Sequence, residues 1–352
     1  MHNGAEPILS VRNLKTYFFQ DEGTVHAVDG VSFDIYQGKT LGIVGESGCG
    51  KSVTARSILR IVERPGRIVE GEIVLRRAGP NGQTDELDLA RLRADSRLMR
   101  SIRGKDIGLV FQEPMTSFSA HYTIGNQISE AVRLHLKLPP RQARERAVEM
   151  LRLVGIPKPE RRIDEYSFQL SGGLRQRAMI AMALSCDPSI LIADEPTTAL
   201  DVTTQAQILA LLERLQQERG MAIILITHNL GVVAEMCEDV VVMYLGRVVE
   251  RGPVDQIFHQ ARHPYTQALL RSIPSIQSEP CVKLPTITGS IPHPYNRPQG
   301  CPFHPRCSHA MPGLCDAQAP TLVPVGPDQE ASCFLYSKVQ SLHPHDQGQG
   351  AT

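Results

Sequence analysis

Short apolar runs recur along residues 1–258 and alternate with helical patterns. Four of these runs are nearly all apolar and occupy residues 40–44, 107–111, 189–193 and 222–227. Strands buried on both faces of a mainly parallel sheet have this composition. Residues 204–219 instead repeat Leu and Ile at helical spacing and end before Gly220, which is typical of an amphipathic helix. The alternation predicts an α/β fold.

Three segments modify this simple pattern. The runs 240–244 and 247–250 flank Leu245-Gly246 and predict an antiparallel hairpin, which makes the sheet mixed rather than purely parallel. Residues 114–186 are mostly helical and predict a helical subdomain inserted into the sheet domain. The arginine-rich segment 76–103 is expected to form a solvated loop and helix.

The character of the chain changes after residue 258. Prolines become frequent and periodicity fades, which predicts a small Cys- and Pro-rich module over residues 259–340. Residues 341–352 show no apolar pattern and are expected to be a disordered tail. The first 258 residues are then one domain.

Composition narrows the classes of protein. The chain of 352 residues has 37 Lys and Arg against 37 Asp and Glu, which argues against sequence-blind nucleic-acid binding. No apolar run approaches the ~18 residues of a membrane-spanning helix. The first residues lack the apolar core of a secretory signal. We therefore expect a soluble, cytosolic protein without a nucleic-acid partner.

Residues 45–52, Gly-Glu-Ser-Gly-Cys-Gly-Lys-Ser, fit the phosphate-loop pattern G-x-x-x-x-G-K-S/T. An isolated match can be a plain glycine turn, but here it joins a predicted strand to a predicted helix, as the motif requires. The glycines let backbone N–H groups and the helix N-terminus face an anion. Lys51 is expected to reach the β- and γ-phosphates and Ser52 to bind Mg²⁺. The candidate ATP-binding residues of this loop are Gly45, Glu46, Ser47, Gly48, Cys49, Gly50, Lys51, Ser52 and Val53.

Two consecutive carboxylates, Asp194 and Glu195, end the apolar run at 189–193. On their own they fit two solvated acids at a strand end. Behind a phosphate loop, Asp194 is expected to hold Mg²⁺, directly or through water. Glu195 is expected to polarise a water against the γ-phosphate.

Residues 170–177, Leu-Ser-Gly-Gly-Leu-Arg-Gln-Arg, precede another helical run. Ser171 suits a helix N-cap, and Gly172 and Gly173 allow close approach of a ligand. One chain therefore carries two phosphate-binding helix ends. That arrangement makes sense if a nucleotide is shared between two copies of the domain.

Taken in order, the phosphate loop, Gln112, Ser-Gly-Gly, Asp-Glu and Thr227-His228 resemble the ATPase subunits of ABC transporters over residues 8–258. The resemblance implies a P-loop NTPase core with an antiparallel N-terminal β subdomain. It implies that Gln112 senses Mg²⁺ and water in a loop that meets the membrane subunits. His228 would bond the γ-phosphate and hold Glu195 and the water in place.

The same resemblance implies a composite ATP site. Residues 171–173 would contact the γ-phosphate held by the opposite subunit, and Asp201 would lie in the loop that links the two sites. An aromatic side chain near the N-terminus would stack on adenine. Phe18 fits by position and Tyr17 nearly as well, although an ordinary edge-strand aromatic remains the alternative.

One position departs from the usual family signature. Leu174 stands where Ser-Gly-Gly-Gln has glutamine, but the peptide-importer branch tends to have an apolar residue there followed by Arg-Gln-Arg. We interpret Leu174 as a marker of that branch. The expected catalytic residues Lys51, Gln112, Glu195 and His228 are all present.

Four cysteines lie close together near the C-terminus, with the spacing Cys-x5-Cys-x7-Cys-x17-Cys, at Cys301, Cys307, Cys315 and Cys333. This spacing is not that of a zinc ribbon, and a reducing cytosol disfavours disulfides. Four thiolates suit a [4Fe–4S] cluster or zinc, and unliganded thiols remain an alternative. Residues 263–270 resemble the start of the C-terminal extension of peptide and nickel importer ATPases, which favours a structural cluster.

The resemblance as a whole implies an ATP-hydrolysing subunit that powers import of di- or oligopeptides. Nickel, another metal complex or another solute is the alternative cargo. The expected partners are two transmembrane permease subunits, a second related ATPase chain and, indirectly, an extracytoplasmic solute-binding protein, at the cytoplasmic face of the inner membrane. A soluble ABC ATPase of DNA repair or translation is disfavoured, since the chain has one cassette, no coiled-coil insertion and no net charge.

Overall fold

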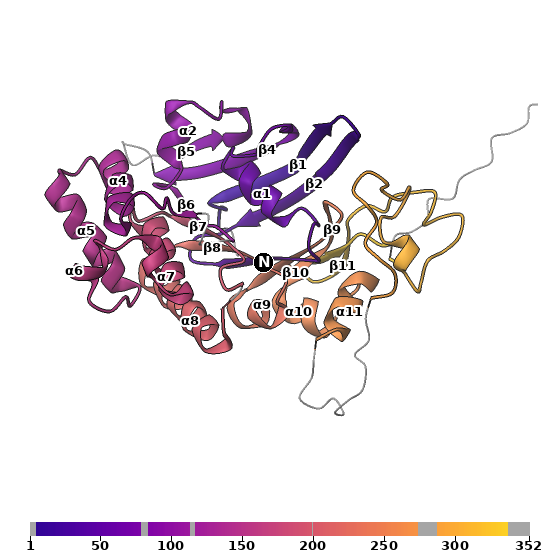
Figure 1. The fold of residues 1–352 in the computed structure, drawn as a ribbon. Coiled ribbons are helices and arrows are strands. Elements are labelled where there is room, and N and C mark those ends of the chain that lie inside the picture. Colours follow the sequence, from indigo (N-terminus) through magenta and orange to yellow (C-terminus); the bar gives the residue numbers. More distant parts are fainter. Residues whose placement is uncertain (1–4, 79–83, 113–116, 199, 274–286, 337–352) are drawn as a thin grey trace, which may run out of the picture.

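Two sheets organise the computed structural model, which describes residues 5–78, 84–112, 117–198, 200–273 and 287–336 (Figure 1). The larger sheet has eight strands in the order β11 (Val323–Gly326), β12 (Gln329–Ala331), β10 (Arg247–Pro253), β9 (Asp239–Tyr244), β3 (Thr40–Val44), β8 (Ala222–Thr227), β7 (Ile190–Asp194) and β6 (Ile107–Val110). The smaller sheet has the order β2 (Gly23–Ile35), β1 (Leu9–Gln20), β4 (Gly66–Ala78) and β5 (Thr84–Asp88).

The five adjacent strands from β9 to β6 pair in parallel. Every residue of β3, β7 and β8 is buried, which explains why these strands are uninterrupted apolar runs in the sequence. The predicted hairpin is confirmed, because β9 and β10 pair antiparallel. The mixed, mainly parallel sheet of the sequence prediction is therefore present.

The smaller sheet is antiparallel throughout. Its edge strand β5 and the end of β4 occupy residues 84–88 and 76–78 of the segment 76–103, which we expected to be loop and helix. The short helices η1 (Leu89–Arg91) and α2 (Arg97–Ile102) and the irregular stretch between them match that expectation. The strand β5 has the polar sequence Thr-Asp-Glu-Leu-Asp because it is a half-exposed edge strand. The strand therefore has too few apolar residues to be predicted from the sequence pattern.

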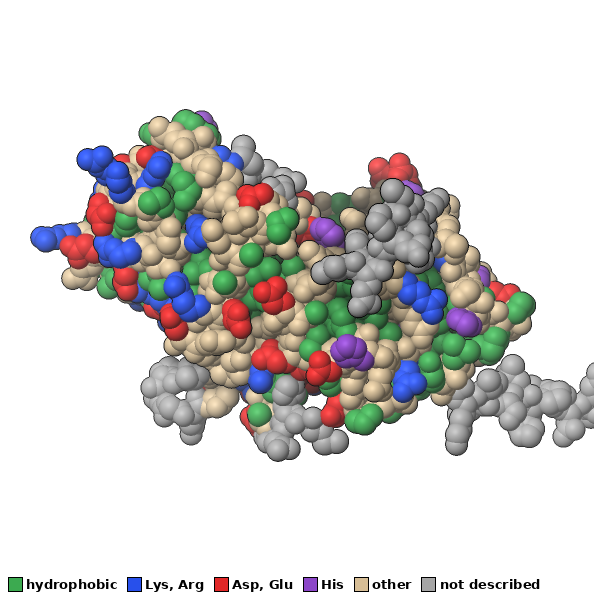
Figure 2. All heavy atoms as spheres, turned by 90° about the horizontal axis from the view of Figure 1, so that it is seen from below, with side chains coloured by type: hydrophobic (Ala, Val, Ile, Leu, Met, Phe, Trp, Pro, Cys, Tyr) green, Lys and Arg blue, Asp and Glu red, His purple; other side chains and the backbone are tan. Residues whose placement is uncertain are grey.

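The helical subdomain forms one end of the molecule (Figure 1). It contains α4 (Ile124–Leu136), α5 (Pro140–Leu153), α6 (Pro159–Arg162), η2 (Ser167–Gln169) and α7 (Gly172–Leu184). One face of α5 buries Ala143, Ala147 and Met150 in the core. The opposite face is charged and carries pairs such as Arg141–Glu145 at 3.1 Å. Figure 2 shows basic and acidic side chains interspersed at this end.

Helix α8 (Val202–Arg219) confirms the helix predicted over 204–219. Asp201 caps its N-terminus, and Gly220, in a left-handed conformation, ends it. Two further helices, α1 (Lys51–Ile58) and α9 (Leu230–Met236), follow β3 and β8 directly. No helix in the described ranges is both long and apolar enough to cross a bilayer.

The chain beyond residue 258 is joined to the larger sheet. After α10 (Val254–His259) and α11 (Pro264–Arg271) come the short helix η3 (His304–Arg306) and strands β11 and β12. Strand β12 pairs with β10. At this junction the fully buried Glu250 accepts hydrogen bonds from the backbone N–H groups of Arg262 (2.7 Å) and His263 (3.0 Å). The domain division at 258 stays a prediction, and the tail over 341–352 lies outside the described residues.

Candidate nucleotide site

The phosphate loop connects the buried strand β3 to helix α1, as the sequence predicted. Its glycines are required by space as well as by backbone conformation. A methyl group at Gly45 (φ 149°) would lie 2.2 Å from the carbonyl oxygen of Met243. A methyl group at Gly50 (φ 100°) would lie 2.2 Å from that of Ala27. The loop can therefore keep this shape only with glycine at both positions.

Lys51 is the first residue of α1 and is only 5% exposed. Its ammonium donates to the backbone oxygens of Gly45 (2.7 Å) and Glu46 (3.1 Å). The lysine thus reaches back over its own loop and places a positive charge inside the loop. Such a charge, together with the helix N-terminus, suits an anion such as a polyphosphate.

Ser52 and Asp194 lie next to each other behind the loop. The Ser52 hydroxyl donates to Oδ1 of Asp194 at 3.0 Å. Burial raises the pKa of Asp194 above its usual range, and the Ser52 hydrogen bond offsets only part of that effect. A hydroxyl and a carboxylate in contact are the oxygen ligands that Mg²⁺ prefers. The structure therefore brings two of the three predicted Mg²⁺ residues together.

Glu195 lies at the centre of a hydrogen-bonded group at the end of β7. Gln112 Nε2 donates to its Oε2 at 3.1 Å, and the Thr198 hydroxyl donates to the same atom at 2.8 Å. Nδ1 of His228 lies 3.2 Å from Oε1. Three of the predicted catalytic residues, Gln112, Glu195 and His228, therefore meet at one carboxylate.

Glu195 has an unusual backbone conformation and a shifted pKa. Its φ of 48° is in the left-handed region, which non-glycine residues rarely adopt and which is common at functional sites. Burial acts to raise the pKa of Glu195, but the hydrogen bonds from Thr198 and His228 outweigh it, so the pKa is lowered. The carboxylate is therefore ionised at neutral pH, as a general base must be.

The Ser-Gly-Gly segment begins α7 as predicted. Ser171 is the N-cap, and its hydroxyl accepts from the backbone N–H of Leu174 at 3.5 Å. Ser171 and Gly172 are exposed, whereas a methyl group at Gly173 would lie 2.8 Å from Cγ2 of Thr204 on α8. This segment presents its helix N-terminus outward instead of adding to the group around Glu195.

Comparison with known proteins agrees with this geometry. Residues 28–198 match the ABC transporter family, and residues 249–315 match the oligopeptide/dipeptide transporter C-terminal region. The oligopeptide transport ATP-binding protein AppD of Bacillus subtilis is 47% identical over 94% of this chain and 97% of its own. The dipeptide transport ATP-binding protein DppD of Escherichia coli is 44% identical over 93% and 96%.

The chain belongs to the ABC transporter ATP-binding protein family. Among solved structures, the dimeric bacterial cassette MJ0796 is 27% identical and superposes with a TM-score of 0.60 over 70% of this chain and 98% of that one. CbiO1 of Clostridium perfringens is 30% identical, with a TM-score of 0.57 over 72% and 92%. The chain is an ATPase of this family, and membership implies membrane permease partners.

The two aromatic candidates of this ABC cassette lie in different surroundings. The Tyr17 ring stacks on His26 at 4.0 Å between centroids, and its hydroxyl donates to Asp29 at 2.9 Å. His26 and Gly48 of the phosphate loop line one cavity. Phe18 instead packs beside Gly66, where a methyl group would lie 2.6 Å from its Cε1. Of the two aromatic residues, Tyr17 is therefore the one that stacks on a residue, His26, beside the phosphate loop.

The four late cysteines gather in one region without forming a metal site. Burial, with smaller contributions from the neighbouring Cys301, Cys307 and Cys315, raises the pKa of Cys333 to about 11. The backbone N–H of Cys301 bonds the carbonyl oxygen of Cys315 at 2.8 Å. In the part of the chain that the structure describes, however, no three His, Cys, Asp or Glu side chains are placed to hold a metal ion. The structure thus lends the expected cluster no support.

Three residues that contact the site, Thr198, Tyr265 and Arg306, were not predicted from the sequence. Thr198 bonds Glu195, and both Tyr265 and Arg306 bond Glu46 of the phosphate loop. Thr198 follows the Asp-Glu pair by three residues, so its closeness could have been inferred. No local pattern links Tyr265 or Arg306 to the loop, since Arg306 is 260 residues away from Glu46.

Proposed function

We propose that this chain hydrolyses ATP to power the import of di- or oligopeptides through a membrane ABC transporter. The observation that carries the proposal is the contact of the Glu195 carboxylate with Gln112, Thr198 and His228, next in sequence to Asp194, which bonds Ser52. The cargo follows from the relatives that are similar over nearly the whole chain, which are named for oligopeptide and dipeptide transport. The C-terminal region matches a peptide-transporter family as well.

The loop residues would take up the phosphates of ATP. The ammonium of Lys51 would exchange the Gly45 and Glu46 carbonyl oxygens for β- and γ-phosphate oxygens, and residues 45–53 would surround them. Ser52, Asp194 and Gln112 would hold Mg²⁺. Glu195 would accept a proton from the attacking water, with His228 bonding the γ-phosphate. Tyr17, stacked on His26, would carry adenine, with Phe18 as the alternative.

The exposed Ser171–Gly172–Gly173 helix end would complete the ATP site of a second subunit. Asp201, which caps α8, would lie in the loop between the two composite sites. A related but different chain is the proposed second ATPase. The outward-facing helix end and the dimeric form of the similar cassette MJ0796 support this arrangement.

We place the assembly at the cytoplasmic face of the inner membrane. Two transmembrane permease subunits would bind near Gln112 and the helical subdomain, and an extracytoplasmic solute-binding protein would deliver cargo to them. Closure of the two ATPases around ATP would then be transmitted to the permeases, and hydrolysis would reopen the pair.

Uptake by cells tests the cargo. A strain that depends on this transporter for a labelled dipeptide is expected to lose uptake when Lys51 is replaced by Ala, because ATP can no longer drive the permease. Labelled nickel uptake is measured in the same cells. Loss of nickel uptake with unchanged peptide uptake would contradict the peptide proposal and favour the nickel alternative.

We further propose that Cys301, Cys307, Cys315 and Cys333 hold a [4Fe–4S] cluster, with zinc as the alternative. The resemblance of residues 263–270 to peptide-importer ATPases and the presence of four cysteines between residues 301 and 333 support this. Their present arrangement is not a ligand set, so the thiols would have to move together around the metal. The cluster would stabilise a proline-rich segment that has little core of its own.

Metal analysis tests the proposed cluster. Chain purified without oxygen is expected to contain about four iron and four acid-labile sulfide per chain. Cys315→Ser should lose most of both, because a cluster ligand is removed. Cys281→Ser, which changes a cysteine outside the four, is the matched control. Zinc without sulfide would contradict the cluster, and neither metal would contradict a metal centre altogether.

A further inference from the structure

Two side chains from the C-terminal part of the chain bind Glu46, the second residue of the phosphate loop. Arg306 donates from Nη1 to Oε2 of Glu46 at 2.7 Å and from Nη2 to Oε1 at 3.0 Å. The Tyr265 hydroxyl accepts from the backbone N–H of Glu46 at 2.9 Å. Lys51 and the backbone N–H of Cys49 donate to the carbonyl oxygen of Glu46, so every polar group of Glu46 has a partner. Two of these four partners, Tyr265 and Arg306, lie beyond residue 258.

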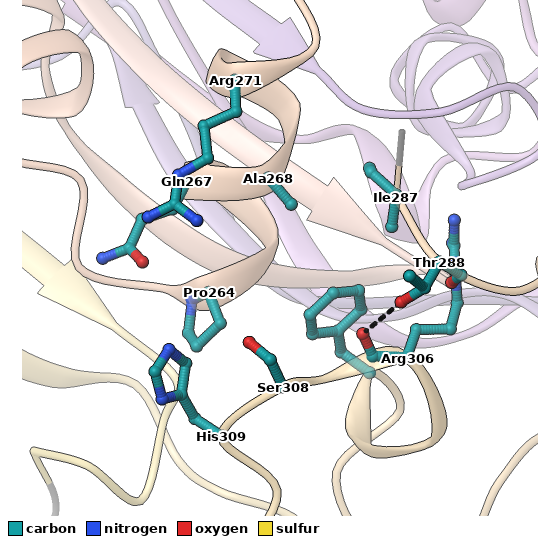
Figure 3. Close-up of a pocket in the computed structure, with 10 residues that line it drawn as sticks. Pro264, Gln267, Ala268, Arg271, Ile287, Thr288, Arg306, Ser308 and His309 are labelled. Atoms are coloured by element: carbon teal, nitrogen blue, oxygen red, sulfur yellow. Dashed lines mark hydrogen bonds between the residues drawn. The ribbon is translucent and has the colours of Figure 1, made fainter. Parts of the chain in front are cut away.

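Contacts other than the one with Glu46 also hold the Arg306 side chain in place. Its side chain is only 4% exposed. Its Nε donates to the carbonyl oxygen of Thr288 at 3.0 Å, and Nη1 lies 3.3 Å from the Tyr244 hydroxyl. Figure 3 shows Arg306 beside Thr288 at the edge of a cavity that α11 and the 303–309 segment also line. A planar guanidinium held in this way binds a carboxylate with both nitrogens and little further loss of entropy.

An aromatic cluster supports both contacts. The ring of Tyr244 in β9 lies 4.7 Å from that of Tyr265 and 5.3 Å from that of Phe303. The Tyr265 and Phe303 rings are 5.3 Å apart, and all three residues are at most 2% exposed. Such packing holds α11 and the segment before Arg306 against strand β9 of the larger sheet. The phosphate loop is therefore linked, through Glu46, to this packed cluster.

The negative charge of Glu46 makes its contacts with Arg306 and Tyr265 relevant to ATP binding. A carboxylate in a loop that surrounds phosphates repels them, because like charges at short range in a partly buried site interact strongly. Arg306 neutralises that carboxylate, and the pairing in turn raises the pKa of Arg306. Without the arginine, Glu46 would be left as an unpaired negative charge beside the nucleotide.

We propose that Arg306 and Tyr265 are positioning residues of the ATP site. They hold Glu46 and cancel its charge, so the C-terminal part of the chain determines how tightly the same chain binds ATP. The inference rests on the proposed role of residues 45–53 in ATP binding. A purely structural role, in which the ion pair only attaches the C-terminal part, is the competing explanation.

The two explanations differ in a double-mutant comparison on the full chain, with the dissociation constant of MgATP measured by direct titration. Arg306→Gln is expected to raise that constant about tenfold. Glu46→Gln alone should change it by less than about threefold, and adding Arg306→Gln to Glu46→Gln should cause no further loss, since no charge is left to neutralise. Arg271→Gln is the matched control, because Arg271 stands on α11 across the same cavity (Figure 3).

A structural role would instead lower the melting temperature and leave the ATP constant unchanged, or would give the same loss with and without Glu46. Either result would overturn the inference. Tyr265→Phe keeps the buried ring and is a second test if Arg306→Gln does not fold. It should raise the constant about threefold by removing the partner of the Glu46 N–H, and an unchanged constant would contradict the proposal.

The wild-type chain and Lys51→Ala separate the inference from the proposed function. If wild type binds MgATP and Lys51→Ala does not, the proposed ATP site is supported. The Arg306 variants then test only the inference about Arg306 and Tyr265. If wild type fails to bind MgATP, the proposed function is wrong and the inference is wrong with it.

Discussion

Glu195→Gln is expected to bind ATP normally but to hydrolyse it at least about 100-fold more slowly. The amide keeps the size of the side chain and can still bond Thr198 and His228, so the site should remain assembled. It cannot accept the proton of the attacking water. With ATP bound but not cleaved, this chain and its proposed partner ATPase should stay closed around ATP, and size-exclusion chromatography of the two chains with ATP should show the trapped dimer.

The control for this variant is Glu145→Gln on α5. Glu145 is an exposed residue paired with Arg141 at 3.1 Å, so its change leaves the nucleotide site intact. Phosphate release by the control should match that of wild type. Normal turnover by Glu195→Gln would refute the role that we assign to this carboxylate.

Lys51→Ala is expected to weaken MgATP binding by about 100-fold or more. The lysine is buried within its own loop, and no nearby side chain of the loop replaces its charge. A direct nucleotide titration measures the loss. Because Lys51 also bonds the Gly45 and Glu46 carbonyl oxygens, the melting temperature of the variant should be recorded in parallel.

Lys39→Ala provides the comparison for the loss of one positive charge. Lys39 precedes the same strand β3 and pairs with Glu238 at 3.4 Å, outside the phosphate loop. It should bind MgATP like wild type. If Lys51→Ala kept wild-type affinity, residues 45–52 would be an ordinary glycine turn and the proposed ATP site would be wrong.

Structural elements that are specified by short stretches of sequence were predictable. The strands β3, β7 and β8 are buried on both faces, so their burial appears directly as apolar runs. Helix α8 has its cap residue, its apolar spacing and its terminal glycine within 20 residues, 201–220. The phosphate loop needs Gly45, Gly50 and Lys51 at set positions. Each of these sequence patterns is local, so it can be recognised without knowledge of the fold.

Features that depend on neighbours distant in sequence were not predictable from local patterns. Strand β5 is polar because it lies at a sheet edge, and only its pairing with β4 identifies it as a strand. Which of Tyr17 and Phe18 belongs to a stacked pair beside the phosphate loop also depends on the fold, and contact of either ring with adenine stays a prediction. The four cysteine thiols were expected to form a ligand set, but spacing along the chain does not determine the distances between sulfur atoms.

The sequence by itself determined the local elements of the candidate site and predicted which residues would carry ATP chemistry, since a phosphate loop, a strand ending in Asp-Glu and a capped Ser-Gly-Gly helix are each recognisable within a few residues. Only the tertiary structure decided what surrounds them. Arg306 reaches Glu46 because β12 pairs with β10 and because Tyr265 and Phe303 pack on Tyr244. The ion pair itself joins residues that are 260 positions apart in the sequence, and it depends on packing that no local pattern records.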